Sequence, residues 1–124
     1  MKLPNGDRAQ LDVERKLVGY CLNPLHRTGR HKARVFASAL GITSHNAELL
    51  EAALRLAAAN NDAKVKDRSV DATKYEIECD VTGPRGSAII RSGWIIERGS
   101  EIPRLTSCYV KRSGGSRGAR TQAS

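Results

Sequence analysis

The chain of 124 residues lacks any long uninterrupted stretch of apolar side chains. A transmembrane helix needs about 20 such residues, and no segment of this sequence approaches that length. The N-terminal residues, MKLPNGDRAQ, also lack the apolar core of a signal peptide. These absences predict a cytoplasmic protein that does not contact a membrane.

Cysteine is scarce, and Cys21, Cys79 and Cys108 lie far apart in the sequence. An odd number of cysteines without a C-x-x-C pair argues against a disulfide framework and against a zinc cluster. We expect the three thiols to be small buried hydrophobic groups. The motifs G-x-x-x-x-G-K-[ST], G-x-G-x-x-G after a strand and G-x-S-x-G are also lacking, so nucleotide-dependent and serine-hydrolase chemistry lose their usual support. No cofactor is expected.

Acidic residues are in the minority, with 13 Asp and Glu against 21 Lys and Arg, which gives a formal net charge of +8. Residues 23–40 and residues 111–124 each carry four cations and no acid. A basic surface attracts polyanions, most commonly nucleic acid, because each phosphate contact releases a condensed counterion. The second stretch has no large apolar residue, which favours a disordered tail that serves solubility. We expect a single domain over residues 1–110, followed by this tail.

Apolar residues recur at helical spacing in three segments of the N-terminal half. Asp12 can cap the first segment, which ends before Asn23-Pro24. The second runs from about Arg30 to Leu40, and Gly41 stands where a left-handed residue would end it. The third begins at about Ala47, is rich in alanine and carries its apolar side chains along one stripe.

Downstream, the apolar period changes to two, which is typical of strands with one buried face. Residues 74–81 alternate strictly, residues 87–97 form an isoleucine-rich run, and residues 104–110 alternate again. Residues 63–68 are a weaker candidate for a first strand. Turn residues separate these runs, so consecutive hairpins are expected. The sequence thus predicts an α+β domain, with N-terminal helices packed on one face of a three- to four-stranded antiparallel meander sheet.

The densest polar cluster is the segment NPLHRTGRHKAR, residues 23–34. Its two imidazoles make a poor metal site, because the surrounding cations oppose a divalent ion and no carboxylate or thiolate stands at ligand spacing. They suit a phosphate better, and backbone amides at the start of the second helix would add to the attraction. The alternative is a solvated basic loop and helix face. The candidate binding residues here are His26, Arg30, His31, Lys32 and Arg34.

The strands supply further candidates. Arg91 lies inside an apolar run, where a charge is costly to bury unless it is paired or faces an open groove. On the last strand Thr106, Ser107 and Tyr109 add hydroxyl groups, and strict alternation there places Leu105, Ser107 and Tyr109 on one face. The structural alternatives are an ordinary salt bridge for Arg91 and simple strand preference for the hydroxyl residues. A histidine, a lysine, an arginine and a hydroxyl suffice for metal-free RNA cleavage.

Several stretches of the chain resemble a family of small bacterial domains of unknown function, often encoded beside a small partner protein. They are KLPNGDRA, KLVGYCLNPLHRTGRHKARVFASALGI, IIRSGWIIE and IPRLTSCY, and the resemblance covers residues 2–110. The order of helices followed by four strands is similar to that of the barnase, EndoU, colicin and RelE ribonuclease superfamily, which includes toxins. This resemblance implies catalytic positions at His31, Lys32, Arg91 and Thr106.

Our leading prediction is a metal-independent endoribonuclease of toxin type that acts by 2′-hydroxyl attack on RNA. His31 would be the acid or base, Lys32 and Arg91 would bind the phosphate, and Thr106 would position it. The predicted substrate-binding residues are His26, Arg30, Arg34, Ser107 and Tyr109. The alternative is a non-catalytic RNA- or protein-binding domain of bacterial or mobile-element origin, which needs no specific histidine or hydroxyl. The expected partners are RNA and a small acidic antitoxin-like protein.

Overall fold

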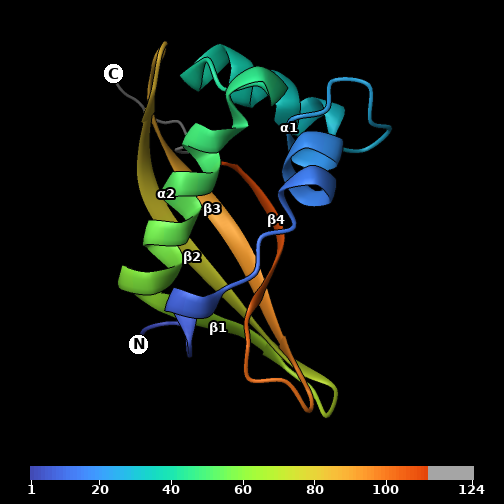
Figure 1. Cartoon of the computed structure of the whole chain (residues 1–124), viewed down its shortest axis with the longest axis vertical. Helices are drawn as coiled ribbons and strands as arrows, with labels where there is room; N and C mark the ends of the chain where they lie inside the picture. The colour runs from blue at the N-terminus through green and yellow to red at the C-terminus, as the bar shows by residue number, and fades with distance from the viewer. Residues whose placement is uncertain (112–124) are drawn as a thin grey trace.

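The computed structural model describes residues 1–111, in which all helices precede the strands (Figure 1). The predicted basic tail lies, from residue 112 onward, outside the described residues. The helices are Val13–Cys21, α1 (Arg30–Val35) continued by Phe36–Leu40, and α2 (Ala47–Asn60), with single turns at Gly6–Arg8 and Ser44–Asn46. The strands are β1 (Ala63–Arg68), β2 (Ala72–Gly83), β3 (Gly86–Glu97) and β4 (Arg104–Val110). None of the described helices is long and apolar enough to cross a membrane.

The first helix begins directly after Asp12, as predicted. The Asp12 carboxylate accepts a hydrogen bond from the Arg15 amide at 3.4 Å, which satisfies one of the free N–H groups of the first turn. Leu17 and Cys21 are buried, in agreement with their helical spacing. The amide of Leu22 donates to the carbonyl of Leu17, five residues back, at 2.8 Å, so the helix is wider than a regular α-helix.

The helix predicted over residues 30–40 is also present, because α1 passes directly into Phe36–Leu40. Gly41 ends it with φ +72°, the left-handed conformation expected of a glycine at that position. Thr43 and Asn46 then form a capping box. The Thr43 hydroxyl accepts a hydrogen bond from the amide of His45, and the Asn46 side-chain oxygen accepts one from the amide of Thr43. The capping box leads into α2, whose alanine-rich sequence favours a helix.

The four strands form one antiparallel sheet in the order β1-β2-β3-β4. β2 and β3 pair along their whole length, from Ala72 opposite Glu97 to Gly83 opposite Gly86. β1 is shorter and pairs only with Thr73–Ile77 of β2. The predicted α+β fold with a three- to four-stranded antiparallel meander is therefore confirmed, and the sheet has four strands.

The prediction that Leu105, Ser107 and Tyr109 share one face of the last strand is wrong. A β-bulge at Thr106 inserts an extra residue, and the register of β4 against β3 shifts there. Leu105 and Cys108, three residues apart, are consequently the buried side chains of β4, and Tyr109 is exposed. Local alternation could not reveal the bulge, because it depends on the partner strand.

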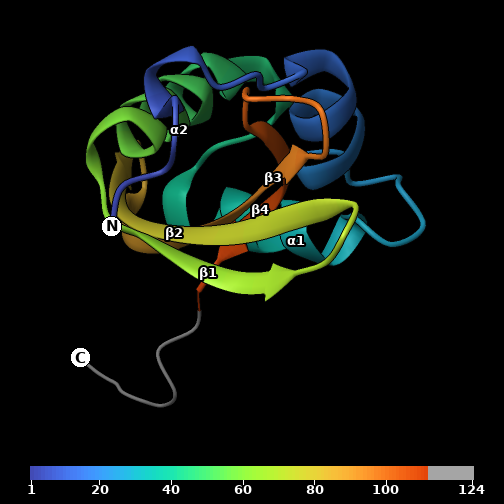
Figure 2. The same cartoon turned by 90° about the horizontal axis from the view of Figure 1, so that it is seen from below.

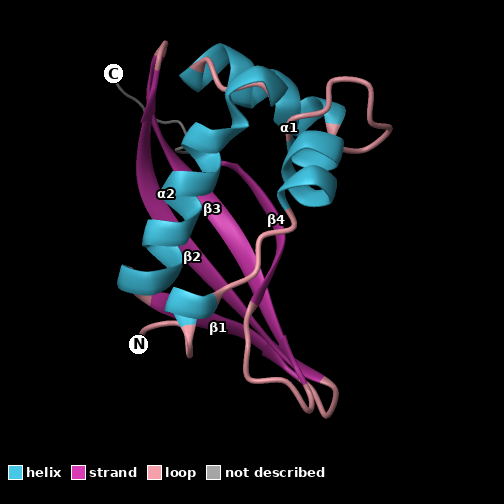
Figure 3. Ribbon diagram, viewed as in Figure 1, coloured by secondary structure: helices cyan, strands magenta, loops and turns pink. Residues whose placement is uncertain are grey.

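The helices cover one face of the sheet and leave the opposite face open (Figures 2 and 3). Trp94 of β3 and Phe36 are buried between the two layers, together with Leu17, Leu54 and Leu105. Burying large apolar side chains in this way is the main stabilising contribution to such a domain. The packing also brings α1 against β4, where several of the predicted site residues lie.

Candidate functional site

A pocket of about 420 Å³ lies between α1 and the end of β4. Helical spacing on α1 directs His31, Lys32 and Arg34 toward it, and Tyr109 of β4 forms part of the opposite wall. His31 and Arg34 are exposed, and Lys32 is half-buried. Four of the predicted site residues are thus brought together in one pocket, which we call the α1–β4 pocket.

Lys32 is held in place by Tyr20 of the first helix. The Lys32 ammonium donates a hydrogen bond to the Tyr20 hydroxyl at 2.6 Å and lies 4.5 Å from the centre of its ring. Both contacts orient the ammonium group, and neither brings a negative charge to it. Within residues 1–111 no carboxylate lies within 4.0 Å of Lys32, so its charge is available to an anion in the pocket.

His26 lies in the loop before α1 and has a defined orientation. Its Nδ1 accepts hydrogen bonds from the backbone amides of Thr28 at 3.1 Å and Gly29 at 3.0 Å. The neutral ring therefore carries its proton on Nε2. The ring also contacts Tyr20 edge to face, with 4.8 Å between centroids. His26 does not line the α1–β4 pocket and is linked to it through Tyr20.

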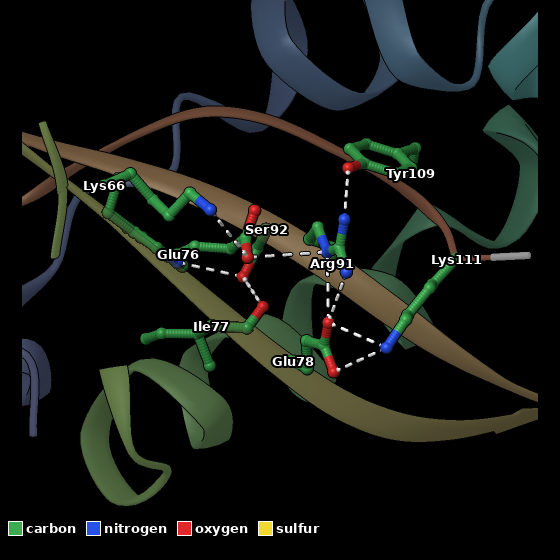
Figure 4. A network of polar contacts seen from close by, with 9 residues as sticks. Lys66, Glu76, Ile77, Glu78, Arg91, Ser92, Tyr109 and Lys111 are labelled. Atoms are coloured by element: carbon green, nitrogen blue, oxygen red, sulfur yellow. Dashed lines mark hydrogen bonds and ion pairs between the residues drawn. The ribbon is translucent and has the colours of Figure 1, made fainter. Parts of the chain in front are cut away.

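Arg91 is placed on the open face of the sheet, in a network of charged groups (Figure 4). It forms an ion pair with Glu78 at 2.7 Å and a second with Glu76 at 3.5 Å, and it donates to the Tyr109 hydroxyl at 3.2 Å. The Lys111 amine also contacts Glu78, at 3.2 Å. The guanidinium thus joins the α1–β4 pocket through Tyr109, while its charge is offset by two carboxylates.

The ion pair affects the pKa of both partners. Hydrogen bonds from Arg91 hold the pKa of the Glu78 carboxyl below its ordinary value, since they stabilise the ionised form. Glu78 in turn raises the pKa of the Arg91 guanidinium, with a further contribution from the Tyr109 hydroxyl. Glu78 occupies the Nε and Nη2 edge of the guanidinium, so a phosphate could make a bidentate contact at that edge only by replacing Glu78.

Thr106 is the bulged residue of β4 and lies beside Gly93 of β3. Its hydroxyl occupies the space of a side chain at position 93, since a Cβ atom there would lie 2.9 Å from Thr106 Oγ1. Glycine therefore permits the close approach of this hydroxyl to the sheet. Thr106 does not line the α1–β4 pocket.

Ser107 faces the first helix rather than the α1–β4 pocket. Its hydroxyl lies 4.0 Å from the sulfur of Cys21, which is buried beside Cys108. A hydrogen bond from the Cys108 thiol lowers the pKa of Cys21 to about 7, against the opposing effect of burial. The same hydrogen bond and the burial raise the pKa of Cys108. These thiols are free, and Cys21 and Cys108 are buried as predicted, while Cys79 is half-buried.

The remaining cations of the cluster lie on the exposed side of α1. Arg30 and Arg34 line a second pocket, of about 370 Å³, so that Arg34 borders both. Arg30 also donates to the backbone carbonyl of Arg27 at 2.6 Å. Among the residues that the structure describes, no carboxylate pairs with Arg27, Arg30 or Arg34. The described part of the chain also has no group of three His, Cys, Asp or Glu residues suited to hold a metal ion.

Three residues that shape this site were not predicted from the sequence. Tyr20 was expected only as an apolar member of the first helix, although it holds Lys32 and contacts His26. Glu76 and Glu78 were expected only as the wet face of a strand. The predicted hairpin places these two residues opposite the strand that carries Arg91, and this position could have indicated the ion pairs, because cross-strand neighbours of opposite charge attract each other.

The fold and the site define a small α+β domain with a helical layer on an antiparallel sheet and a cationic pocket at the sheet edge. The chain belongs to a family described as a domain of unknown function (DUF6883), whose model matches residues 2–112. This match confirms the predicted membership of a family of unknown function. No curated protein matches the chain. No solved structure matches it either.

Proposed function

We propose that the domain binds the phosphate backbone of RNA in the α1–β4 pocket and cleaves it without a metal ion. The supporting observation is that His31, Lys32 and Arg34 share this pocket with Tyr109, whose hydroxyl is bound to Arg91. An imidazole, several cations and a hydroxyl near one phosphate are the groups that such cleavage requires. The biological role proposed is that of a cytoplasmic toxin.

In the proposed reaction, His31 takes the proton of a ribose 2′-hydroxyl. The 2′-oxygen attacks the adjacent phosphorus, the bond to the 5′-oxygen breaks, and this oxygen leaves with a proton from water. The hydroxide that remains takes the proton held by His31, which restores the neutral imidazole and the water. Lys32 and Arg34 stabilise the charge that develops on the phosphoryl oxygens. The products are a 2′,3′-cyclic phosphate and a 5′-hydroxyl.

Arg91 and Thr106 have supporting roles in this proposal. Arg91 orients Tyr109, and it contacts a phosphate where that group replaces Glu78. Thr106 lies on the neighbouring part of β4 and positions the chain of RNA beyond the pocket. His26 and Arg30 extend the binding surface along the loop and the exposed side of α1.

Replacing His31 with alanine tests the proposal. The His31→Ala variant should cleave a single-stranded RNA at least about 100-fold more slowly than the unchanged protein, because it lacks the proton acceptor. Its affinity for an RNA with 2′-deoxy residues, which cannot be cleaved by this route, should change little. Both quantities are measured with the purified protein in EDTA, and expression of the variant should no longer inhibit growth.

Arg98→Ala provides the control, since Arg98 is exposed at the turn between β3 and β4 and takes no part in the pocket. It should cleave at the unchanged rate. Full activity of His31→Ala, cleavage of the 2′-deoxy RNA, or loss of activity in EDTA would each contradict the mechanism.

The second candidate is a domain that binds RNA or an acidic protein without cleaving either. The ion pairs that offset Arg91 favour it, because they leave only the exposed cations of α1 and its preceding loop for an anion. Under this proposal the unchanged protein binds RNA in a salt-sensitive manner and yields no product. A small acidic antitoxin-like protein would bind the same cations and compete with the RNA.

A further inference from the structure

The second half of β2 has an open edge. β1 pairs with β2 only as far as Ile77. Within residues 1–111, the segment 78–82 pairs with β3 along one edge and with no strand along the other. Ser92 Oγ donates to the carbonyl of Ile77, which therefore points toward β3. Asn61 Nδ2 donates to the carbonyl of Glu78, which points away from β3.

The backbone N–H and C=O groups of successive strand residues point to opposite edges of the strand. Those of Asp80 and Thr82 therefore point to the same edge as those of Glu78, away from β3. Both residues are exposed. In the described part of the chain, no hydrogen bond is made by the outward N–H and C=O groups of Asp80 and Thr82. Such an edge is a template for a further strand.

An apolar groove runs beside this edge. Leu49, Ala53 and Leu56 lie on one side of α2, and they line a groove of about 280 Å³ together with Cys79 and Val81 of β2. The side chains of Leu49 and Leu56 are 41% and 65% exposed, which is unusual for two leucines on one side of a helix. Figure 1 shows α2 running alongside β2.

The charge of the groove differs from that of the whole molecule. Its lining contains the carboxylate of Asp80 and no cation, although the chain carries +8. Among the described residues, no Lys, Arg or His lies within 4.0 Å of the Asp80 carboxylate. A basic side chain on an incoming segment is therefore the complementary group.

We propose that this groove binds an extended segment of a partner protein, which adds to β2 as a fifth strand. The segment alternates apolar and basic side chains: the apolar ones face Leu49 and Leu56, and the basic ones face Asp80. Backbone hydrogen bonds to Asp80 and Thr82 supply the affinity, and the two kinds of side chain supply the specificity. The groove is formed by α2 and β2, whereas the α1–β4 pocket is formed by α1 and β4, so this proposal is independent of RNA binding.

Two other occupants fit less well. Residues 112–124 of the same chain supply arginine, but their only apolar side chains are alanines, which cannot fill a groove lined by leucines. A second copy that paired through the same edge would place the acidic groups of Glu78 and Asp80 near their counterparts, and like charges across a strand pair are unfavourable.

The test uses the full chain and two labelled hexapeptides, one alternating lysine with valine and the other glutamate with valine. The lysine peptide should bind at least about tenfold more tightly, and Asp80→Lys should reverse this preference. In hydrogen exchange followed by NMR, the amides of Asp80 and Thr82 should become slow only when the lysine peptide is bound. Those of Cys79 and Val81, which face β3, should be slow throughout.

Leu56→Glu should weaken binding of the lysine peptide at least tenfold. Val70→Glu is the matched control, because Val70 is 79% exposed in the turn between β1 and β2, away from the groove, and it should bind normally. Equal affinity for both peptides, or binding that Leu56→Glu does not change, would overturn the proposal. Slow exchange at the amides of Asp80 and Thr82 without peptide would also overturn the proposal. If that slow exchange did not depend on protein concentration, it would indicate that the chain's own tail occupies the groove. If it did depend on concentration, it would indicate a second copy of the chain.

Discussion

Ser92 shows how a single buried hydroxyl is accommodated in the core of this domain. It lies in the middle of β3, fully buried, where a polar group is costly unless it is hydrogen bonded. Its Oγ donates to the carbonyl of Ile77 at 3.1 Å and accepts from the indole N–H of Trp94 at 2.9 Å. Ser92 therefore orients the largest side chain of the core.

Replacing Ser92 with alanine should lower the free energy of unfolding by about 1–3 kcal/mol, because the indole N–H of Trp94 would remain buried without an acceptor. The measurement is urea denaturation followed by the fluorescence of the single tryptophan. Ser38→Ala serves as the control, since Ser38 is exposed and bonds only to a carbonyl of its own helix, and it should change stability by less than about 0.5 kcal/mol. Equal stability of the two variants would show that the buried network contributes nothing.

At the scale of elements, the end of the helix over residues 30–40 positions the cationic side of α1. Gly41 reverses the chain with a positive φ, and a side chain there would meet Arg85 in the hairpin between β2 and β3. The carbonyl of Leu40 also accepts a hydrogen bond from the amide of Arg85 at 3.0 Å. This contact joins the helix to the sheet.

Gly41→Ala should destabilise the domain by about 2–3 kcal/mol, which combines left-handed strain with a Cβ placed 2.8 Å from the Arg85 side chain. Gly99→Ala isolates the first effect, because Gly99 has φ +85° but a Cβ atom added there would meet no other atom within 4 Å. It should cost only about 1–2 kcal/mol. Thermal unfolding of both variants measures the difference, and a greater loss in Gly99→Ala would argue against the helix–hairpin contact.

At the scale of the whole molecule, the uneven distribution of charge matters more than the sum. On the open face of the sheet, Glu76 and Glu78 form ion pairs with Lys66, Arg91 and Lys111. No described carboxylate pairs with a cation of α1 or of the loop before it. An anion is therefore attracted to the α1–β4 pocket and its neighbour without displacing an existing carboxylate partner.

The proposed binding of RNA should consequently weaken steeply with salt, and the slope of log affinity against log salt should shrink by about one for each phosphate contact removed. Replacing both Arg27 and Arg34 with alanine should reduce this slope by about two. The affinities are measured by fluorescence anisotropy at salt concentrations between about 50 and 200 mM. Arg98→Ala should leave the slope unchanged. An unaltered slope in the double variant would place the RNA elsewhere on the molecule.

Local patterns in the sequence determined the elements of this protein. The change of apolar period from helical to alternating, the caps at Asp12 and Thr43 and the glycine at position 41 depend on neighbours a few residues apart, and the corresponding helices and strands are present. The cation cluster at residues 26–34 was equally visible, because charge is a property of composition. For the same reason, the sequence could propose His31, Lys32 and Arg34 as a group.

Only the tertiary structure decided how remote segments meet. It placed Tyr20 against Lys32, opposed Glu78 to Arg91 across two strands, and shifted β4 by a bulge so that Cys108 rather than Ser107 shares the buried face with Leu105. It also began β1 only at Ala63, opposite Ile77, and so left the edge of the second half of β2 open beside two leucines of α2. Strand register and helix docking result from the summed packing of residues far apart in the chain, and no local pattern encodes that sum.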